Sequence, residues 1–149
     1  MSEAIIRQKI YSEILEIADI GKVYDYERWT ADWQAFINLF KDSVSERILG
    51  WEIGRKGAPA EYDDNAEEMT SHQFFIRGYM GLKDADGTEK LFNAKIELIR
   101  AKFRFNFTLD GLCEMAGPVS ADIIELRMFG NVLCHYCELS LPVQEIFTS

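Results

Sequence analysis

The sequence predicts an α+β fold, in which a mixed or antiparallel sheet of about four strands is flanked by two main helices. Two long segments place apolar residues at helical spacing, and the segments between and after them are rich in strand-favouring residues. The chain has 149 residues, of which 48% are hydrophobic. We therefore expect a single domain, residues 1–149, built around one core.

The N-terminal segment, residues 2–18, predicts the first main helix. Its isoleucines recur at steps of four, four and three and mark one face: Ile6, Ile10, Ile14 and Ile17. Gly21 follows where a helix C-cap is expected. Residues 21–29, GKVYDYERW, alternate in the manner of a short strand.

The next two elements are a short helix and a strand. Residues 30–42 predict the helix, with Thr30 as its N-cap and with Trp33 and Phe40 in the core. Residues 47–56, RILGWEIGRK, favour the strand.

Residues 57–70 differ in composition from the rest of the chain. They contain no basic residue, and Pro59 discourages regular structure, so we expect a long exposed loop. Its acidic residues are Glu61, Asp63, Asp64, Glu67 and Glu68. Such a run usually forms a solvated surface, although carboxylates are also the oxygen ligands of calcium and magnesium. Its low apolar content predicts mobility in the isolated subunit and ordering in an assembly.

The second half of the chain predicts a strand, a helix and a last strand. Residues 71–83 favour a strand that pairs antiparallel with residues 47–56, and DADG at 84–87 is a turn signal. The clearest helix runs from Thr88 to about Phe105. After a loop, residues 123–143 predict one long final strand.

Near the C-terminus, NVLCHYCELSL gathers two of the three cysteines and one of the two histidines. On a strand, Cys134 and Tyr136 face one side of the sheet while His135 and Cys137 face the other, so the two thiols do not chelate one ion. A zinc site would need a tight turn and further ligands, and a redox pair would open a helix. We therefore favour strand residues over a metal or redox site, and we expect no catalytic, cofactor-binding or metal-binding residues.

The composition limits the class of partner. A formal net charge of −9 opposes affinity for nucleic-acid backbones. The N-terminal MSEAIIRQKIYSEIL lacks the apolar core of a secretory signal, and no run approaches the ~18 apolar residues of a membrane span. We expect a soluble protein that is made in the cytoplasm and keeps its cysteines as thiols.

Two segments carry a family resemblance. IGKVYDYERW follows the N-terminal amphipathic helix, and ELRMFGNVLCHYCELSLPVQE closes the chain. Together with the chain length and the order of elements, they resemble the tail terminator, or tail completion, proteins of tailed bacteriophages. The resemblance implies a non-enzymatic subunit of a hexameric ring, which binds the end of the tail tube, stops its polymerisation and provides the joint to the head.

The resemblance also implies partners and a location. The partners are other copies of the chain, the tail tube protein and a head–tail connector or neck protein, with the sheath protein as a further candidate. DNA would pass through the lumen without specific binding, and no membrane is involved. The protein would lie in the virion, at the head-proximal end of the tail, after synthesis in the host cytoplasm.

Candidate interaction residues come from two segments. One is aromatic and serves either packing or an interface; the other is the acidic loop, which the resemblance places in the ring interior or on the tube-facing surface. The residues are Tyr24, Tyr26, Arg28, Trp29, Glu61, Asp63, Asp64, Glu67 and Glu68. The alternatives are another neck or tail component, such as a head-closure or tube-like subunit, and a small α+β enzyme that uses His72 or His135.

Overall fold

The computed structural model describes residues 2–43 and 47–148. The helices of this part are α1 (Ser2–Leu15), α2 (Trp33–Phe40) and α3 (Thr88–Phe103), with a single 3₁₀ turn, η1 (Asp84–Asp86). The strands are β1 (Lys22–Tyr24), β2 (Leu49–Arg55), β3 (Ala60–Tyr62), β4 (Glu68–Gly81), β5 (Met115–Ala116), β6 (Ser120–Phe129) and β7 (Val132–Phe147). The α+β class is confirmed, but the described residues form seven strands and three α-helices, more than the predicted four and two.

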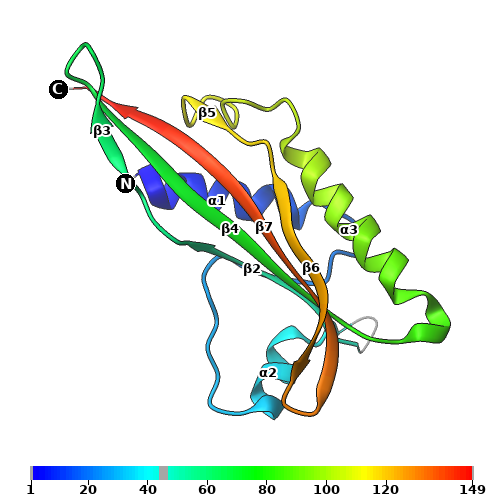
Figure 1. Ribbon diagram of the computed structural model, residues 1–149. Coiled ribbons are helices and arrows are strands. Elements are labelled where there is room, and N and C mark those ends of the chain that lie inside the picture. The colour runs from blue at the N-terminus through cyan, green and yellow to red at the C-terminus, as the bar shows by residue number, and fades with distance from the viewer. Residues whose placement is uncertain (1, 44–46, 149) are drawn as a thin grey trace.

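Two long antiparallel strands, β4 and β7, form the centre of one mixed sheet and run side by side along the molecule (Figure 1). First β2 and then β3 pair with the outer edge of β4, while β6 and β5 pair with the outer edge of β7. Beyond β2, β1 adds a parallel strand. The predicted antiparallel pairing of residues 47–56 with 71–83 is confirmed by β2 and β4.

The two faces of the sheet carry separate apolar clusters. On one face, α1 and α3 bury stripes of isoleucine and phenylalanine against Trp51, Ile76 and Leu139. On the other face, Phe40 of α2 packs with Tyr79 and with the β7 side chains of that face. Burying one large apolar side chain contributes roughly 1.5–3 kcal/mol, so the larger cluster under α1 and α3 dominates the stability of the fold.

The predicted loop at residues 57–70 is instead most of a β-hairpin. Ala60–Tyr62 pairs with the first residues of β4, and the backbone N–H of Asp63 donates to the carbonyl of Glu67 at 2.9 Å. The prediction was wrong because it weighed side chains alone. This end of β4 is also paired with β7, where Glu68 lies opposite Phe147, so backbone hydrogen bonds order the segment without much apolar burial.

The predicted single strand at residues 123–143 is two strands. β6 ends at Phe129, the chain turns at Gly130 and Asn131, and β7 begins at Val132. Gly130 has a φ of +65°, which a side chain would disfavour. A Gly-Asn pair between two apolar runs is a hairpin signal, and the single-strand prediction overlooks it.

Two local predictions near the N-terminus were also wrong. Asp32 rather than Thr30 caps α2, and its carboxylate accepts a hydrogen bond from the N–H of Ala35 at 2.8 Å. Gly21 does not cap α1. A Cβ atom at Gly21 would lie 2.4 Å from the carbonyl oxygen of Leu49, so glycine is needed for the close approach to β2.

Candidate interaction surfaces

The Cys134–Cys137 segment lies in β7 and alternates between the two faces of the sheet. Cys134 and Tyr136 join the cluster on the α2 side, and Cys137 joins the cluster under α1 and α3, as the strand prediction requires. Burial raises the pKa of Cys134 to about 11 and also raises the pKa of Cys137, so both remain thiols at neutral pH. Within the described residues, no group of three or more His, Cys, Asp or Glu side chains could hold a metal ion.

His72 is a buried side chain of β4 with both ring nitrogens engaged. Its Nδ1 lies 3.0 Å from Nη1 of Arg55, and its Nε2 lies 2.9 Å from Oε1 of Glu145. A guanidinium only donates, so Nδ1 accepts and Nε2 donates to the carboxylate. This ring links β2, β4 and β7, and neither nitrogen is left for a substrate.

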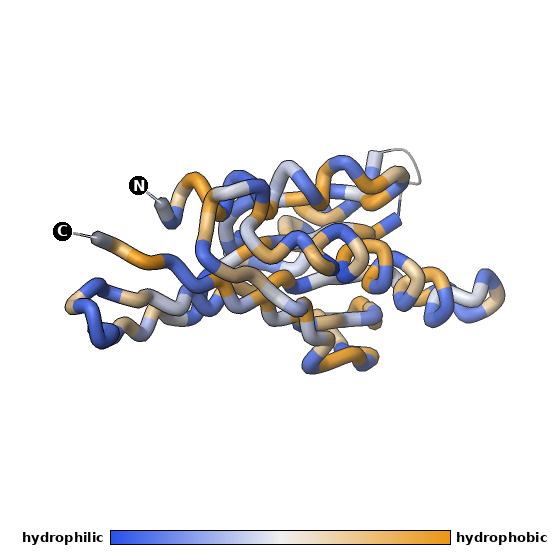
Figure 2. Tube along the Cα trace, turned by 90° about the horizontal axis from the view of Figure 1, so that it is seen from above, coloured by the Kyte–Doolittle hydropathy of each residue, from blue (hydrophilic) through white to orange (hydrophobic). Residues whose placement is uncertain are grey.

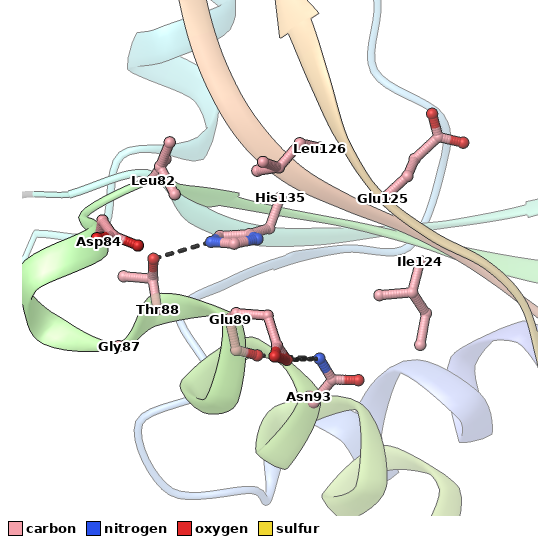
Figure 3. Close-up of a pocket in the computed structure, with 10 residues that line it drawn as sticks. All are labelled: Leu82, Asp84, Gly87, Thr88, Glu89, Asn93, Ile124, Glu125, Leu126 and His135. Carbon is pink, nitrogen blue, oxygen red and sulfur yellow. Dashed lines mark hydrogen bonds between the residues drawn. The ribbon is translucent and has the colours of Figure 1, made fainter.

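His135 lines a pocket of about 350 Å³ between the N-terminal end of α3 and β6 (Figure 3). Its Nε2 lies 2.8 Å from the hydroxyl oxygen of Thr88, which also accepts from the backbone N–H of Lys83 at 3.1 Å. Burial lowers the pKa of His135, against a smaller opposing effect of Glu89, so the ring is neutral at pH 7. Thr88 is only 1% exposed, which places its hydroxyl in the structure of the helix start rather than in reach of a substrate.

Along the same pocket, β6 presents apolar residues at a sheet edge. Within the described residues β6 pairs with β7 alone, so its other edge meets no strand. The side chains of Ile124, Leu126 and Met128 are 45%, 49% and 58% exposed. Leu133 lies opposite Met128, and Leu82 donates its N–H to the carbonyl of Leu133 at 3.3 Å. We term these five residues the β6 strip.

A second apolar surface follows the C-terminal end of α3. Phe105 is 79% exposed, and Phe107 and Met115 beside it are about half exposed. Phe105 also has a φ of +65°, a conformation that is strained for a bulky residue. We term Phe105, Phe107 and Met115 the Phe105 surface. The length of α3, ~22 Å at 1.5 Å per residue, separates it from the pocket and the β6 strip.

The predicted aromatic residues divide between packing and surface. β1 ends at Tyr24, so residues 25–29 are not a strand. Tyr24 is half-buried, and its hydroxyl donates to the carbonyl of Leu39 at 2.5 Å, so this residue packs. Arg28 lies over the rings of Tyr24 and Tyr26, at 4.6 and 4.9 Å from their centroids, while Tyr26 and Trp29 are exposed.

The predicted acidic residues lie around the tip of the β3–β4 hairpin, which projects near the C-terminus (Figures 1 and 2). Figure 2 shows hydrophilic residues at this tip. The carboxylate of Asp63 accepts from the N–H groups of Asn65 and Glu67 at 2.9 and 3.0 Å, so Asp63 builds the turn. The other acidic side chains are exposed or half-exposed: Glu61, Asp64, Glu67 and Glu68.

Sequence reasoning missed a charged network on the α2 side of the sheet. Glu52 is 3% exposed and accepts from the N–H of Arg28 and the hydroxyl of Tyr79, and burial raises its pKa. Arg77 lies 2.7 Å from Glu27 and 3.8 Å from Glu52. These contacts hold the segment after β1 against the sheet. The network could not be predicted because its residues are far apart in the chain. The only indication in the sequence is a glutamate, Glu52, between Trp51 and Ile53 in a predicted strand.

Comparison of the chain with models of known protein families and with curated proteins found no match. No helix in the described ranges is long and apolar enough to cross a membrane. The functional interpretation therefore depends on the surfaces of the chain itself.

Proposed function

We propose that the chain is a structural subunit of a tailed bacteriophage. It forms a ring, of six copies by family resemblance, that caps the head-proximal end of the tail tube. The ring stops tube polymerisation and provides the joint to the head connector, and it acts by binding without catalysis. The observation that carries this proposal is the unpaired, apolar edge formed by the β6 strip.

The β6 strip favours association because it combines an unpaired strand edge with exposed apolar side chains. The free edge of β6 offers backbone groups that another chain can engage, and its apolar side chains remain in water in the isolated subunit. Burying one such side chain at an interface contributes roughly 1.5–3 kcal/mol before the cost of ordering. No charged side chain interrupts the outward-facing series Ile124, Leu126, Met128.

Two distinct apolar surfaces favour a ring over a two-fold dimer. The β6 strip is aliphatic, the Phe105 surface is aromatic, and they lie at opposite ends of α3. A contact between two different surfaces is heterologous, and repetition of such a contact gives a closed ring when the rotation between copies closes. Both surfaces of every copy are then covered.

The charge of the chain suits a ring around DNA. Six copies carry about −54 in total, from −9 per copy, and the acidic hairpin concentrates part of that charge at one projecting tip. A lumen or tube-facing rim lined by carboxylates would repel the DNA backbone and let it slide. The enzyme alternative has less support, because His72 is fully engaged and the hydroxyl beside His135 is buried.

Deletion of the gene from its phage tests the proposal, with electron microscopy of the particles as the readout. The proposal predicts tails of uncontrolled length or tails that fail to join heads. The wild-type gene supplied in trans should restore normal particles. Normal infectious particles without the gene would contradict the proposal, and tails of normal length beside open heads would favour a head-closure subunit.

A further inference from the structure

We propose that Arg104 of one copy inserts into the pocket between α3 and β6 of the next copy and pairs there with Glu89 and Asp84. The ligand of the pocket is thus a guanidinium side chain, and its source is a second copy of this chain. This inference rests on the proposed function, because it specifies the contact between neighbours in the ring.

The pocket has the lining that a cationic side chain with an apolar stem requires. Leu82, Ile124 and Leu126 supply apolar walls for the stem. Asp84 and Glu89 supply carboxylates, and no Lys or Arg is among the described residues that line the pocket. A carboxylate pair beside apolar walls favours arginine, whose planar guanidinium binds carboxylates through several donors at once.

The polar groups of the pocket are arranged for a cation. The Nδ2 of Asn93 donates to the carboxylate of Glu89 at 2.7 Å and orients it, which leaves the Asn93 carbonyl oxygen as a further acceptor (Figure 3). His135 is neutral at pH 7 and adds no competing charge. The helix N-terminus favours anions, but Glu89 in the first turn of α3 offsets that effect.

Two cations close to the pocket residues in sequence, Arg127 and Lys83, are engaged elsewhere. Figure 3 shows the carboxylate of Glu125 pointing away from the pocket, and Arg127 pairs with it there at 3.2 Å. The ammonium of Lys83 lies 3.4 Å from the carboxylate of Asp86. The pocket carboxylates are therefore left for a group from another molecule.

Arg104 is the complementary group. In the described part of the chain, it is the one arginine whose guanidinium has no hydrogen-bond, ion-pair or ring partner. It is exposed and precedes Phe105, so the cation and the Phe105 surface project together. The neighbouring phenyl rings suit the β6 strip, while the guanidinium suits the pocket beside it. Within one copy the two sites lie at opposite ends of α3 and cannot meet.

A charge exchange tests this contact by sedimentation velocity of the full chain. Arg104→Glu and Glu89→Arg should each weaken association at least about tenfold, because each places like charges in the contact. The double variant should regain most of the wild-type association, and so should the two variants mixed in equal amounts, because a ring of alternating copies pairs opposite charges at every contact. Lys95→Glu makes the same charge change as Arg104→Glu elsewhere on the chain and should associate like the wild type.

Two results separate this contact from the ring itself. If the wild type associates and Arg104→Glu associates equally well, or if the double variant regains no association, the proposed Arg104 contact is wrong. The proposed ring is not affected by that result. If the wild type does not associate, the ring and the contact between copies both fail. Titration with n-butylguanidinium then tests the pocket alone by NMR: saturable shifts of His135 and Leu126, absent with 1-butanol and with Glu89→Gln, would uphold its guanidinium specificity, and their absence would overturn it.

Discussion

The strands β6 and β7 form one hairpin, yet their apolar residues meet opposite surroundings. β7 is paired along both edges, with β4 on one side and with β6 and β5 on the other, and its side chains Leu139, Leu141 and Val143 are completely buried. β6 lies at the edge, and Ile124 and Leu126 on the same face of the sheet are about half exposed. Position in the sheet, rather than residue type, therefore decides whether an apolar strand residue is buried in the core of the subunit or left exposed on its surface.

The largest expected effect comes from the same truncation on the two strands. Leu139→Ala should lower the free energy of unfolding by about 2–5 kcal/mol, because it leaves a cavity in the core. Leu126→Ala should lower it by less than about 1 kcal/mol, because the side chain is half exposed. Urea unfolding of dilute monomer measures both. Equal losses of unfolding free energy in the two variants would show that β6 and β7 contribute alike to the stability of the subunit.

A smaller effect on stability, which depends on pH, is expected at the buried carboxylate of Glu52 in β2. Burial raises the pKa of Glu52 above its ordinary value of 4.5, so the folded state favours the protonated form. The stability from protonated Glu52 is present below pH 4.5 and is lost as the pH rises through the folded pKa. The stability of Glu52→Gln relative to wild type should therefore rise with pH above 4.5, by up to about 1.4 kcal/mol per unit of pKa shift.

Unfolding curves at a series of pH values check this expectation. The difference between Leu126→Ala and the wild type provides the control and should stay constant over the same range. A constant difference for Glu52→Gln as well would mean that Glu52 is not effectively desolvated.

The smallest effect is expected at another exposed edge. Tyr62 in β3 is 78% exposed, but its neighbours in the hairpin are acidic rather than apolar. Tyr62→Lys should change the free energy of unfolding by less than about 0.5 kcal/mol and leave self-association intact. If this variant failed to associate, the interface between copies would have to be assigned to the β3–β4 hairpin instead of β6.

The sequence predicts what depends on local periodicity. The isoleucines of α1, the phenylalanines and isoleucines of α3, the β2–β4 pairing and the alternation at Cys134 and Cys137 all follow from spacing along the chain. The hairpin at Gly130 was also within reach, because Gly-Asn is a local turn signal.

The rest depends on contacts between distant segments. Strand order places β6 at an edge, and the pairing of β4 with β7 orders the hairpin at residues 57–70, but neither is encoded in a local pattern. The pocket has the same origin, since it joins the start of α3 to β6 and to His135 of β7. Of the predicted interaction residues, Tyr24 and Asp63 have structural roles, while Tyr26 and Trp29 remain surface residues.

Sedimentation velocity of the wild type and Leu126→Lys tests whether the β6 strip joins copies of the chain into a ring. We predict that the wild type forms a closed species near 103 kDa, six times the 17.2 kDa chain, and that Leu126→Lys sediments as a folded monomer. A lysine at this exposed position has little effect on the fold but places a charge in the β6 strip. A wild type that stays monomeric would rule out the ring, and a Leu126→Lys variant that assembles like the wild type would rule out the β6 strip as its interface.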